Sequence, residues 1–397
     1  MDFRETASRL PLVFAWLSVM VLLLGRFWWP GETSAWASTL RFCLGFFLLA
    51  ALLRWRQVLF ELADRQLLLL MAAFTLWVVA SVLWLGGEAD ILRRGLVLLV
   101  FMIAVAFLAG RYPRALMQLL QAAAVLGAFA AVVTLYLKLQ KSGFDFRYRA
   151  FQLHSSGISG FAEFGNPIIS GMHLAFAGLT AFCCLLSSRL WSSRLFWGLL
   201  LLPIGGYAFL TFSRSAWLAL VVGGLFLLWR FGNRRIWLLS GAAFLLVMAM
   251  VLMRFPGMFG IEAARNVTYR DLIWRMVLDA MPGYWLQGHG AGVSMDVMHI
   301  PNQTVVNTHS LYLEVLFQYG MTGLLMFLGM FALAIRRLWL CSSPLALLAL
   351  ALLLASSAVM FFELHSFIHS PNLIWLWIWL PMAIALGSRG KCSCSLK

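Results

Sequence analysis

Charged residues are scarce in this chain: Asp, Glu, Lys and Arg make up only 11% of its 397 residues, and 62% are hydrophobic. A soluble domain carries about 25% charged residues. The uncharged residues form runs of roughly the 17–25 residues that cross a bilayer. Backbone groups in hydrocarbon must satisfy one another, so these runs are predicted to be helices. They lack the polar–apolar alternation of barrel strands, which argues against an outer-membrane barrel.

Cysteines and cleavable leader signals are also lacking. None of the six cysteines falls in the long loops predicted below, so no disulfide framework is expected. Cys392 and Cys394 form only half of a metal-binding motif, and we predict no metal and no cofactor. Arg4 and Arg9 precede an apolar run without a small-residue cleavage site, which predicts an uncleaved first helix. The net charge of +15 is spread over helix ends, so nucleic-acid binding is not expected.

The apolar runs predict an all-α polytopic membrane protein that forms one transmembrane domain over residues 1–397. No internal repeat or low-complexity linker divides it. We predict twelve spans, at 10–29, 34–53, 67–86, 91–109, 115–137, 166–187, 195–212, 214–231, 236–253, 311–335, 343–362 and 373–388.

The basic residues predict how the chain is oriented. More than half of the 30 Lys and Arg residues fall in the short loops and termini of one side, which is therefore expected to be cytoplasmic. Both termini lie on that side. Two long loops, 138–165 and 254–310, are expected on the opposite side of the membrane.

The loop 254–310 is too rich in Trp, Tyr, Leu and Ile to be disordered. Apolar residues at helical spacing predict a helix over 263–281, ended by Pro282-Gly283, so the loop should form a helical cap. The glycines between Gly288 and Gly292 follow no strand and open no helix, so they do not meet the condition for a phosphate-cradling loop. We expect them to form a tight turn.

Three segments on the loop side carry candidate chemistry. Arg214 lies where the seventh span meets the eighth, and an arginine there needs water, a partner or a ligand, or else snorkels to headgroups. Arg265 and Arg270 lie on the loop helix five residues apart, about 140° around it, so they and Arg275 cannot all share one face. They bind a ligand or pair with nearby acids. His309, before the tenth span, is placed to accept a proton or to cap the helix.

Two further groups have open interpretations. Arg147 and Arg149 alternate with aromatic residues in the first loop, and either hold lipid phosphates at the interface or are solvated charges. Glu363, His365 and His369 cluster beyond the eleventh span, where contact with an acceptor, gating or an interfacial role is favoured over metal binding.

Together these segments resemble the O-antigen ligase/polymerase family of membrane glycosyltransferases, over roughly residues 160–335. The first five spans match it only in hydropathy. Ser310 stands where the family commonly has Asn. The matching residues are Ser213-Arg214, Arg270-x-x-x-Trp274 with Pro282, Gly288-x-Gly290-x-Gly292, His309-Ser310-x-Tyr312-Leu313 with Gly320 and Gly323, and Gly165-Asn166-Pro167.

The resemblance, closest to the lipopolysaccharide O-antigen ligases, implies a GT-C-like fold in the inner membrane of a Gram-negative bacterium, surrounded by membrane lipids, with a periplasmic active site. It implies metal-independent transfer of O-antigen from undecaprenyl pyrophosphate to a sugar hydroxyl of lipid A–core, with inversion. The alternatives are an O-antigen polymerase, a protein O-oligosaccharyltransferase, or, from another class, a transporter or flippase. His309, Arg214 and Arg270 are the expected catalytic residues; Arg265, Arg147, Arg149, Ser310 and Tyr312 are expected to bind substrate.

Overall fold

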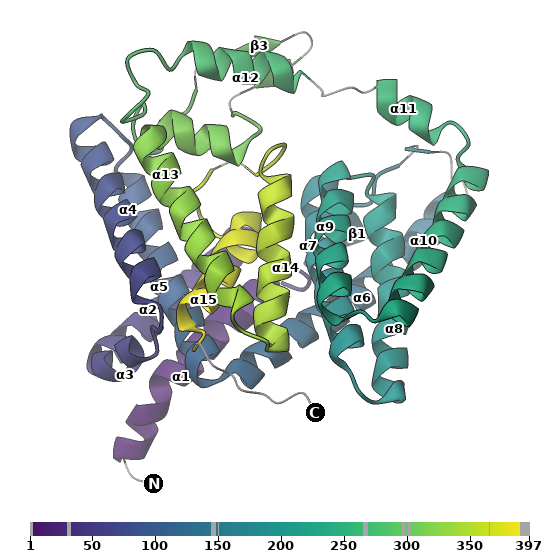
Figure 1. Cartoon of the computed structure of the whole chain (residues 1–397), viewed down its shortest axis with the longest axis horizontal. Coiled ribbons are helices and arrows are strands. Elements are labelled where there is room, and N and C mark those ends of the chain that lie inside the picture. Colours follow the sequence, from purple (N-terminus) through teal and green to yellow (C-terminus); the bar gives the residue numbers. More distant parts are fainter. Residues whose placement is uncertain are drawn as a thin grey trace.

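The computed structural model describes residues 3–29, 33–143, 148–149, 151–264, 269–295, 298–300, 303–305, 307–364 and 366–389. These residues form a helical bundle with two small antiparallel hairpins (Figure 1). The helices are α1 (Phe3–Gly25), α2 (Thr33–Leu53), α3 (Trp55–Phe60), α4 (Arg65–Trp84), α5 (Asp90–Arg111), α6 (Pro113–Ser142), α7 (Pro167–Ser187), α8 (Trp191–Leu210), α9 (Arg214–Phe231), α10 (Arg234–Arg254), α11 (Met258–Ala264), α12 (Arg270–Asp279), α13 (Leu311–Trp339), α14 (Pro344–Val359), the π-helical turn η1 (Trp375–Trp379) and α15 (Leu380–Gly387). The strands are β1 (Ser155–Ile158), β2 (Phe161–Glu163), β3 (Met298–Ile300) and β4 (Gln303–Val305).

The membrane-spanning character of the bundle follows from helix length and composition. Within the described residues, nine helices are long and apolar enough to cross a bilayer. Three shorter apolar helices, Leu10–Gly25, Pro344–Val359 and Trp375–Gly387, occupy the remaining places where spans were expected. The all-α polytopic class is confirmed, whereas the count of twelve spans stays a prediction.

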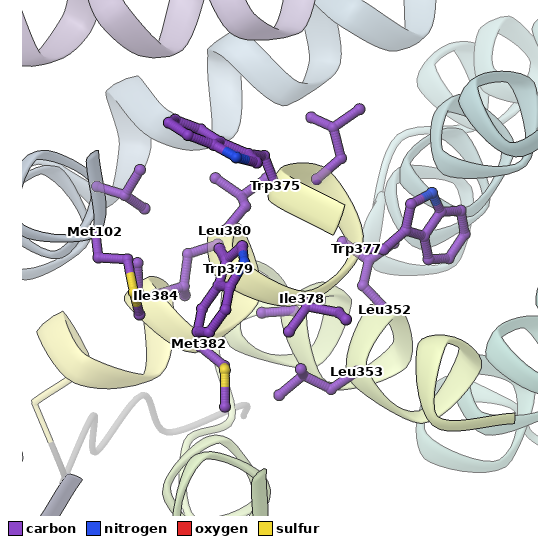
Figure 2. Close-up of a cluster of buried hydrophobic side chains, with 14 of the residues drawn as sticks. Met102, Leu352, Leu353, Trp375, Trp377, Ile378, Trp379, Leu380, Met382 and Ile384 are labelled. Atoms are coloured by element: carbon purple, nitrogen blue, oxygen red, sulfur yellow. The ribbon is translucent and has the colours of Figure 1, made fainter. Parts of the chain in front are cut away.

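The centre of the bundle is built around η1 and α15, whose residues are all buried. Figure 2 shows Trp375, Trp377 and Trp379 projecting in different directions from this segment. The ring of Trp375 lies 4.7 Å from that of Phe101 on α5, and Trp377 lies 6.1 Å from Phe176 on α7. This segment therefore contacts both α5 and α7 from the interior of the bundle. By contrast, α10 is apolar but buries none of its residues, as expected of a helix that faces lipid.

We call the end of the bundle that carries α11, α12 and β3 the loop end; it lies opposite the N-terminus (Figure 1). The helix expected over 263–281 is shorter than that. Tyr269 adopts a left-handed conformation, with φ of 60°, immediately before α12 begins at Arg270, so a regular helix cannot run through it. In the first loop, α6 continues to Ser142, beyond the expected boundary at 138, and β1 and β2 form a hairpin.

The backbone of the glycine-rich stretch, 288–292, packs closely against α13. Gly288 has φ of 76°, and a Cβ there would lie 2.5 Å from the carbonyl oxygen of Gln318. Gly320, where α13 is kinked, has φ of 67°, and a Cβ there would lie 2.3 Å from the oxygen of Leu286. Only glycine allows the two backbones to approach so closely. The N–H of Met321 donates to the oxygen of a loop residue at 2.7 Å, which closes the junction. This stretch holds the first turns of α13 in place.

Candidate active site

Three of the segments singled out in the sequence meet at the loop end. A cavity of about 690 Å³ is lined by Arg149, Arg214, Arg270 and His309; we call it the arginine cavity. Arg214 is the first residue of α9, Arg270 is the first residue of α12, and His309 lies two residues before α13. The fold thus brings together three guanidinium groups and one imidazole from positions far apart in the chain.

Three helices also begin at this cavity. Its wall includes Asn166 and Pro167 at the start of α7, and Ser213 before Arg214 at the start of α9. The side chain of Asn166 accepts from the Ile169 N–H at 2.8 Å, which caps α7. Tyr269 and Arg270, at the start of α12, complete the set. Helix N-termini carry a partial positive charge and free N–H groups, so they add to the arginines in favouring an anion.

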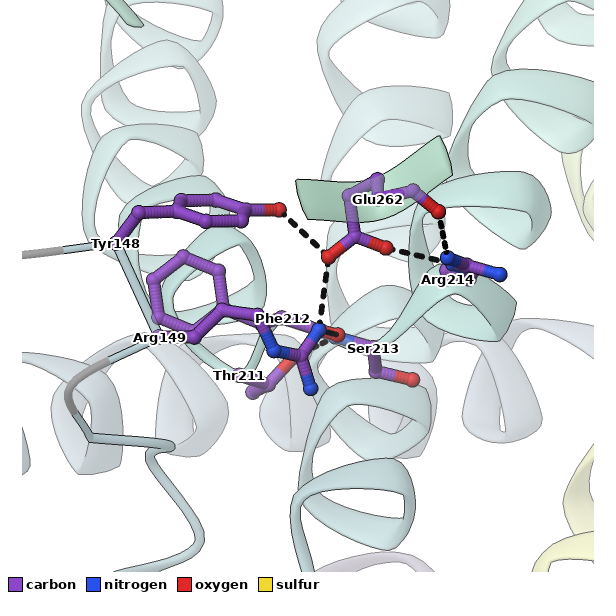
Figure 3. A network of polar contacts seen from close by, with 7 residues as sticks. All are labelled: Tyr148, Arg149, Thr211, Phe212, Ser213, Arg214 and Glu262. Carbon is purple, nitrogen blue, oxygen red and sulfur yellow. Dashed lines mark hydrogen bonds and ion pairs between the residues drawn. The ribbon is translucent and has the colours of Figure 1, made fainter. Parts of the chain in front are cut away.

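Glu262 on α11 joins two of the guanidinium groups (Figure 3). Its Oε2 accepts from Arg214 Nε at 2.6 Å, and its Oε1 accepts from Arg149 Nη1 at 2.9 Å. The hydroxyl of Tyr148 donates to the same Oε1 at 3.0 Å. Arg214 Nη2 also donates to the main-chain oxygen of Glu262 at 2.5 Å. A single carboxylate therefore fixes two cations side by side against the cavity wall.

Arg270 is held by the segment that follows α14. Its Nη2 donates to Glu363 Oε1 at 2.8 Å, and its Nε donates to the Phe362 carbonyl oxygen at 3.0 Å. Burial raises the pKa of Glu363, and the charge of Arg270 opposes that rise. Glu262 and Glu363 thus each pair with a guanidinium. A phosphate oxygen can take the place of the carboxylate oxygen in such a pair.

The backbone at His309 is constrained. Its φ is 48°, in the left-handed region, which few non-glycine residues adopt. The N–H of His309 donates to Asn307 Oδ1 at 3.2 Å. Neighbouring Thr308 donates to Glu314 Oε2 at 3.1 Å, and Glu314 Oε1 accepts from Gln318 Nε2 at 2.7 Å. This buried chain of bonds fixes the turn that aims His309 into the cavity.

The region that contains these residues matches a family model described as O-antigen ligase, over residues 198–328. Arg214, Arg270 and His309 all lie within the match. The chain is also 26% identical, over 384 residues, to the O-antigen ligase of Pseudomonas aeruginosa; the alignment covers 94% of this chain and 90% of the relative. The resemblance to the O-antigen ligase family is thereby confirmed.

The other expected site residues lie in different surroundings. Among the described residues, Ser310 and Tyr312 are not part of the arginine cavity wall. Ser310 Oγ donates to the Met360 oxygen at 3.3 Å, and the Tyr312 hydroxyl donates to the Ser357 oxygen at 3.0 Å. Both anchor the start of α13 to the end of α14. Arg147, Arg265 and His365 lie outside the described residues.

Sequence reasoning missed Glu262 as a partner of Arg214, and it missed the helix N-termini. The sequence predicted acidic partners only for the arginines of the loop helix, and only from nearby in the chain. The helix starts did carry a signal, because Asn166-Pro167 is a typical N-cap followed by a first-turn proline. Ser213 before Arg214 is a second N-cap of the same kind. Among the described residues, no three potential metal ligands gather.

Proposed function

We propose that this protein transfers a glycan from undecaprenyl pyrophosphate to a sugar hydroxyl of lipid A–core. The loop end would face the periplasm of a Gram-negative bacterium, with both termini in the cytoplasm. The observation that carries the proposal is the arginine cavity itself, which brings three guanidinium groups and three helix starts beside one imidazole. The likeness to O-antigen ligases supports the class of reaction.

The arginines match the leaving group. As the bond between the anomeric carbon and the phosphate oxygen breaks, its electron pair goes to the pyrophosphate, which becomes more negative. Guanidinium groups fit phosphate oxygens with two parallel N–H donors. Arg214 and Arg270 are assigned to this role, and Arg149 extends the cationic wall beyond Arg214. Fixed charges in a site shielded from bulk water are commonly the largest contribution to catalysis.

Donor binding would change the hydrogen-bond partners of the arginines and would add no cation to the cavity. In the free protein, Glu262 and Glu363 hold the guanidinium groups within the cavity wall. Pyrophosphate oxygens would take over some of these N–H donors. The carboxylates thus keep the arginines ordered before binding, which lowers the entropy lost when the donor arrives.

His309 is assigned to the acceptor. The acceptor hydroxyl gives its proton to the imidazole while its oxygen forms the new bond to the anomeric carbon, opposite the departing pyrophosphate. A single displacement of this kind inverts the anomeric centre. The bonds from Asn307 and the Thr308–Glu314 pair hold His309 in position for that step.

The test is transfer by the purified protein, with lipid-linked O-antigen as donor and no divalent metal added. Three acceptors are compared: lipid A–core, a second lipid-linked glycan, and a serine-containing peptide. A ladder on lipid A–core in a gel supports the proposal. Growth of the lipid-linked glycan instead would identify a polymerase, and a glycosylated peptide would identify a protein oligosaccharyltransferase. Movement of intact donor across vesicle membranes without transfer would identify a flippase.

A further inference from the structure

A second cavity adjoins the arginine cavity. It has a volume of about 480 Å³ and lies between the loop-end parts of α1, α2 and α7 and the segment before η1. Asn166, Ile168, His309 and Glu363 line both cavities. The candidate base is therefore in the wall between two spaces, so groups in either space can approach it.

Among the described residues that line the second cavity, Arg26 is the only arginine or lysine. The guanidinium of Arg26, just after α1, lies 5.5 Å from the ring centre of Trp36 and 5.9 Å from that of Phe164. Burial lowers the pKa of Arg26, but a guanidinium stays charged at neutral pH. Burial also lowers the pKa of His369, which lines the same cavity, so that imidazole is neutral there. Arg26 thus supplies positive charge in the second cavity, whereas Glu363 on the shared wall is paired with Arg270.

Backbone strain marks both cavities. Among the described residues, every non-glycine residue with positive φ except Ala162 lines one of them. Leu364 and Ser366, with φ of 65° and 66°, line the second cavity. Strained backbone of this kind persists where the surrounding structure enforces it, and it clusters at ligand-binding sites.

We propose that the second cavity is the acceptor subsite, and that Arg26 binds an anionic group, phosphate or carboxylate, on the acceptor glycolipid. This inference rests on the proposed function. If pyrophosphate occupies the arginine cavity, an oxygen that attacks from the opposite side of the anomeric carbon must come from another direction past His309. The second cavity provides that direction. Its Arg26 cation, asparagine amides and apolar side chains suit an acidic sugar attached to lipid, and the Glu363 carboxylate on the shared wall is paired with Arg270.

Steady-state kinetics of the purified protein separate the two substrates. We expect Arg26→Gln to raise the KM for lipid A–core at least tenfold, with the KM for the lipid-linked donor changed less than twofold. Arg26→Lys, which keeps the charge, should recover part of the loss. Arg93→Gln is the matched control, because Arg93 is exposed on α5 and pairs with Asp90 at 2.6 Å outside both cavities. Acceptor stripped of phosphate shows the source of the anion: if the effect of Arg26→Gln disappears, Arg26 binds phosphate, and if it persists, Arg26 binds a carboxylate.

A second variant and a binding measurement complete the test. Leu373→Trp adds bulk to the second cavity, and should raise the acceptor KM without weakening binding of undecaprenyl pyrophosphate. An acceptor KM that stays within twofold of wild type in both Arg26→Gln and Leu373→Trp would overturn the inference, as would a selective rise of the donor KM. If wild type transfers nothing, the proposed function fails. In that case the affinity for lipid A–core is measured without donor. Weaker binding to Arg26→Gln than to wild type supports the subsite, and equal binding overturns it.

Discussion

Replacing Arg214 by alanine tests how the arginine cavity acts. Arg214 donates two hydrogen bonds, from Nε and Nη2, that pyrophosphate can take over from Glu262. A hydrogen bond to a charged group contributes about 1.5–3 kcal/mol. The side chain is 40% exposed, so the lower end of that range applies. Two such bonds give about 3 kcal/mol, and we expect Arg214→Ala to lower the transfer rate at least about a hundredfold, which corresponds to about 2.7 kcal/mol.

The variant should fold, because Glu262 keeps Arg149 and Tyr148 as partners. The rate is measured with saturating lipid A–core and purified lipid-linked glycan. The matched control is Arg230→Ala, in the last turn of the same helix and exposed at the other end of the bundle. We expect the control to retain the wild-type rate. An Arg214→Ala protein within threefold of wild type would refute the role of this guanidinium.

Three further predictions concern the base and its support. His309→Ala should lower kcat by roughly a hundredfold to ten-thousandfold with donor binding intact. Wild type should give a product with inverted anomeric configuration, and a retained anomeric configuration would exclude direct displacement. Glu314→Ala leaves Gln318 and Thr308 without their carboxylate acceptor and should lower the free energy of unfolding by about 1–3 kcal/mol. Denaturant titration measures this change, and the stability of Glu314→Gln should lie between those of wild type and Glu314→Ala. Equal stability of all three proteins would contradict this prediction. Gly320→Ala brings a carbon within 2.3 Å of a backbone oxygen at positive φ and should destabilise the protein by more than about 1 kcal/mol. Gly224→Ala, in open space on α9, should not, and equal thermal midpoints for the two glycine variants would count against the α13 junction.

Hydropathy predicted the helices well. A segment that crosses hydrocarbon has apolar side chains along its length, and it has to pair its backbone N–H and C=O groups internally, as a helix does. The start of α13 at Leu311 and the end of α10 at Arg254 lie within a residue of the expected boundaries. The loop helix was predicted less well. The apolar residues at helical spacing begin at Leu272, and nothing in that pattern records the left-handed Tyr269 before α12. Local backbone conformation is set here by tertiary packing, which periodicity does not encode.

The same distinction holds for the site. Arg214 and His309 stood out because polar residues at span ends need partners, and Arg270 stood out as one of the arginines of the loop helix. The fold groups them in one cavity, and their catalytic roles stay a prediction. The partners themselves could not be predicted, since Glu262 and Glu363 reach Arg214 and Arg270 across 48 and 93 residues of chain. Arg26 falls near the end of the first predicted span, 10–29, and belongs to none of the motifs found in the sequence. Its place in the second cavity depends on how α1, α2 and α7 pack.

The most direct test of the account is a structure of the protein with undecaprenyl pyrophosphate bound. We predict that the pyrophosphate oxygens lie within hydrogen-bond distance of Arg214 and Arg270, that Glu262 has given up at least one guanidinium bond, and that the anomeric position faces His309. Pyrophosphate bound in the second cavity beside Arg26, or away from both cavities, would contradict it.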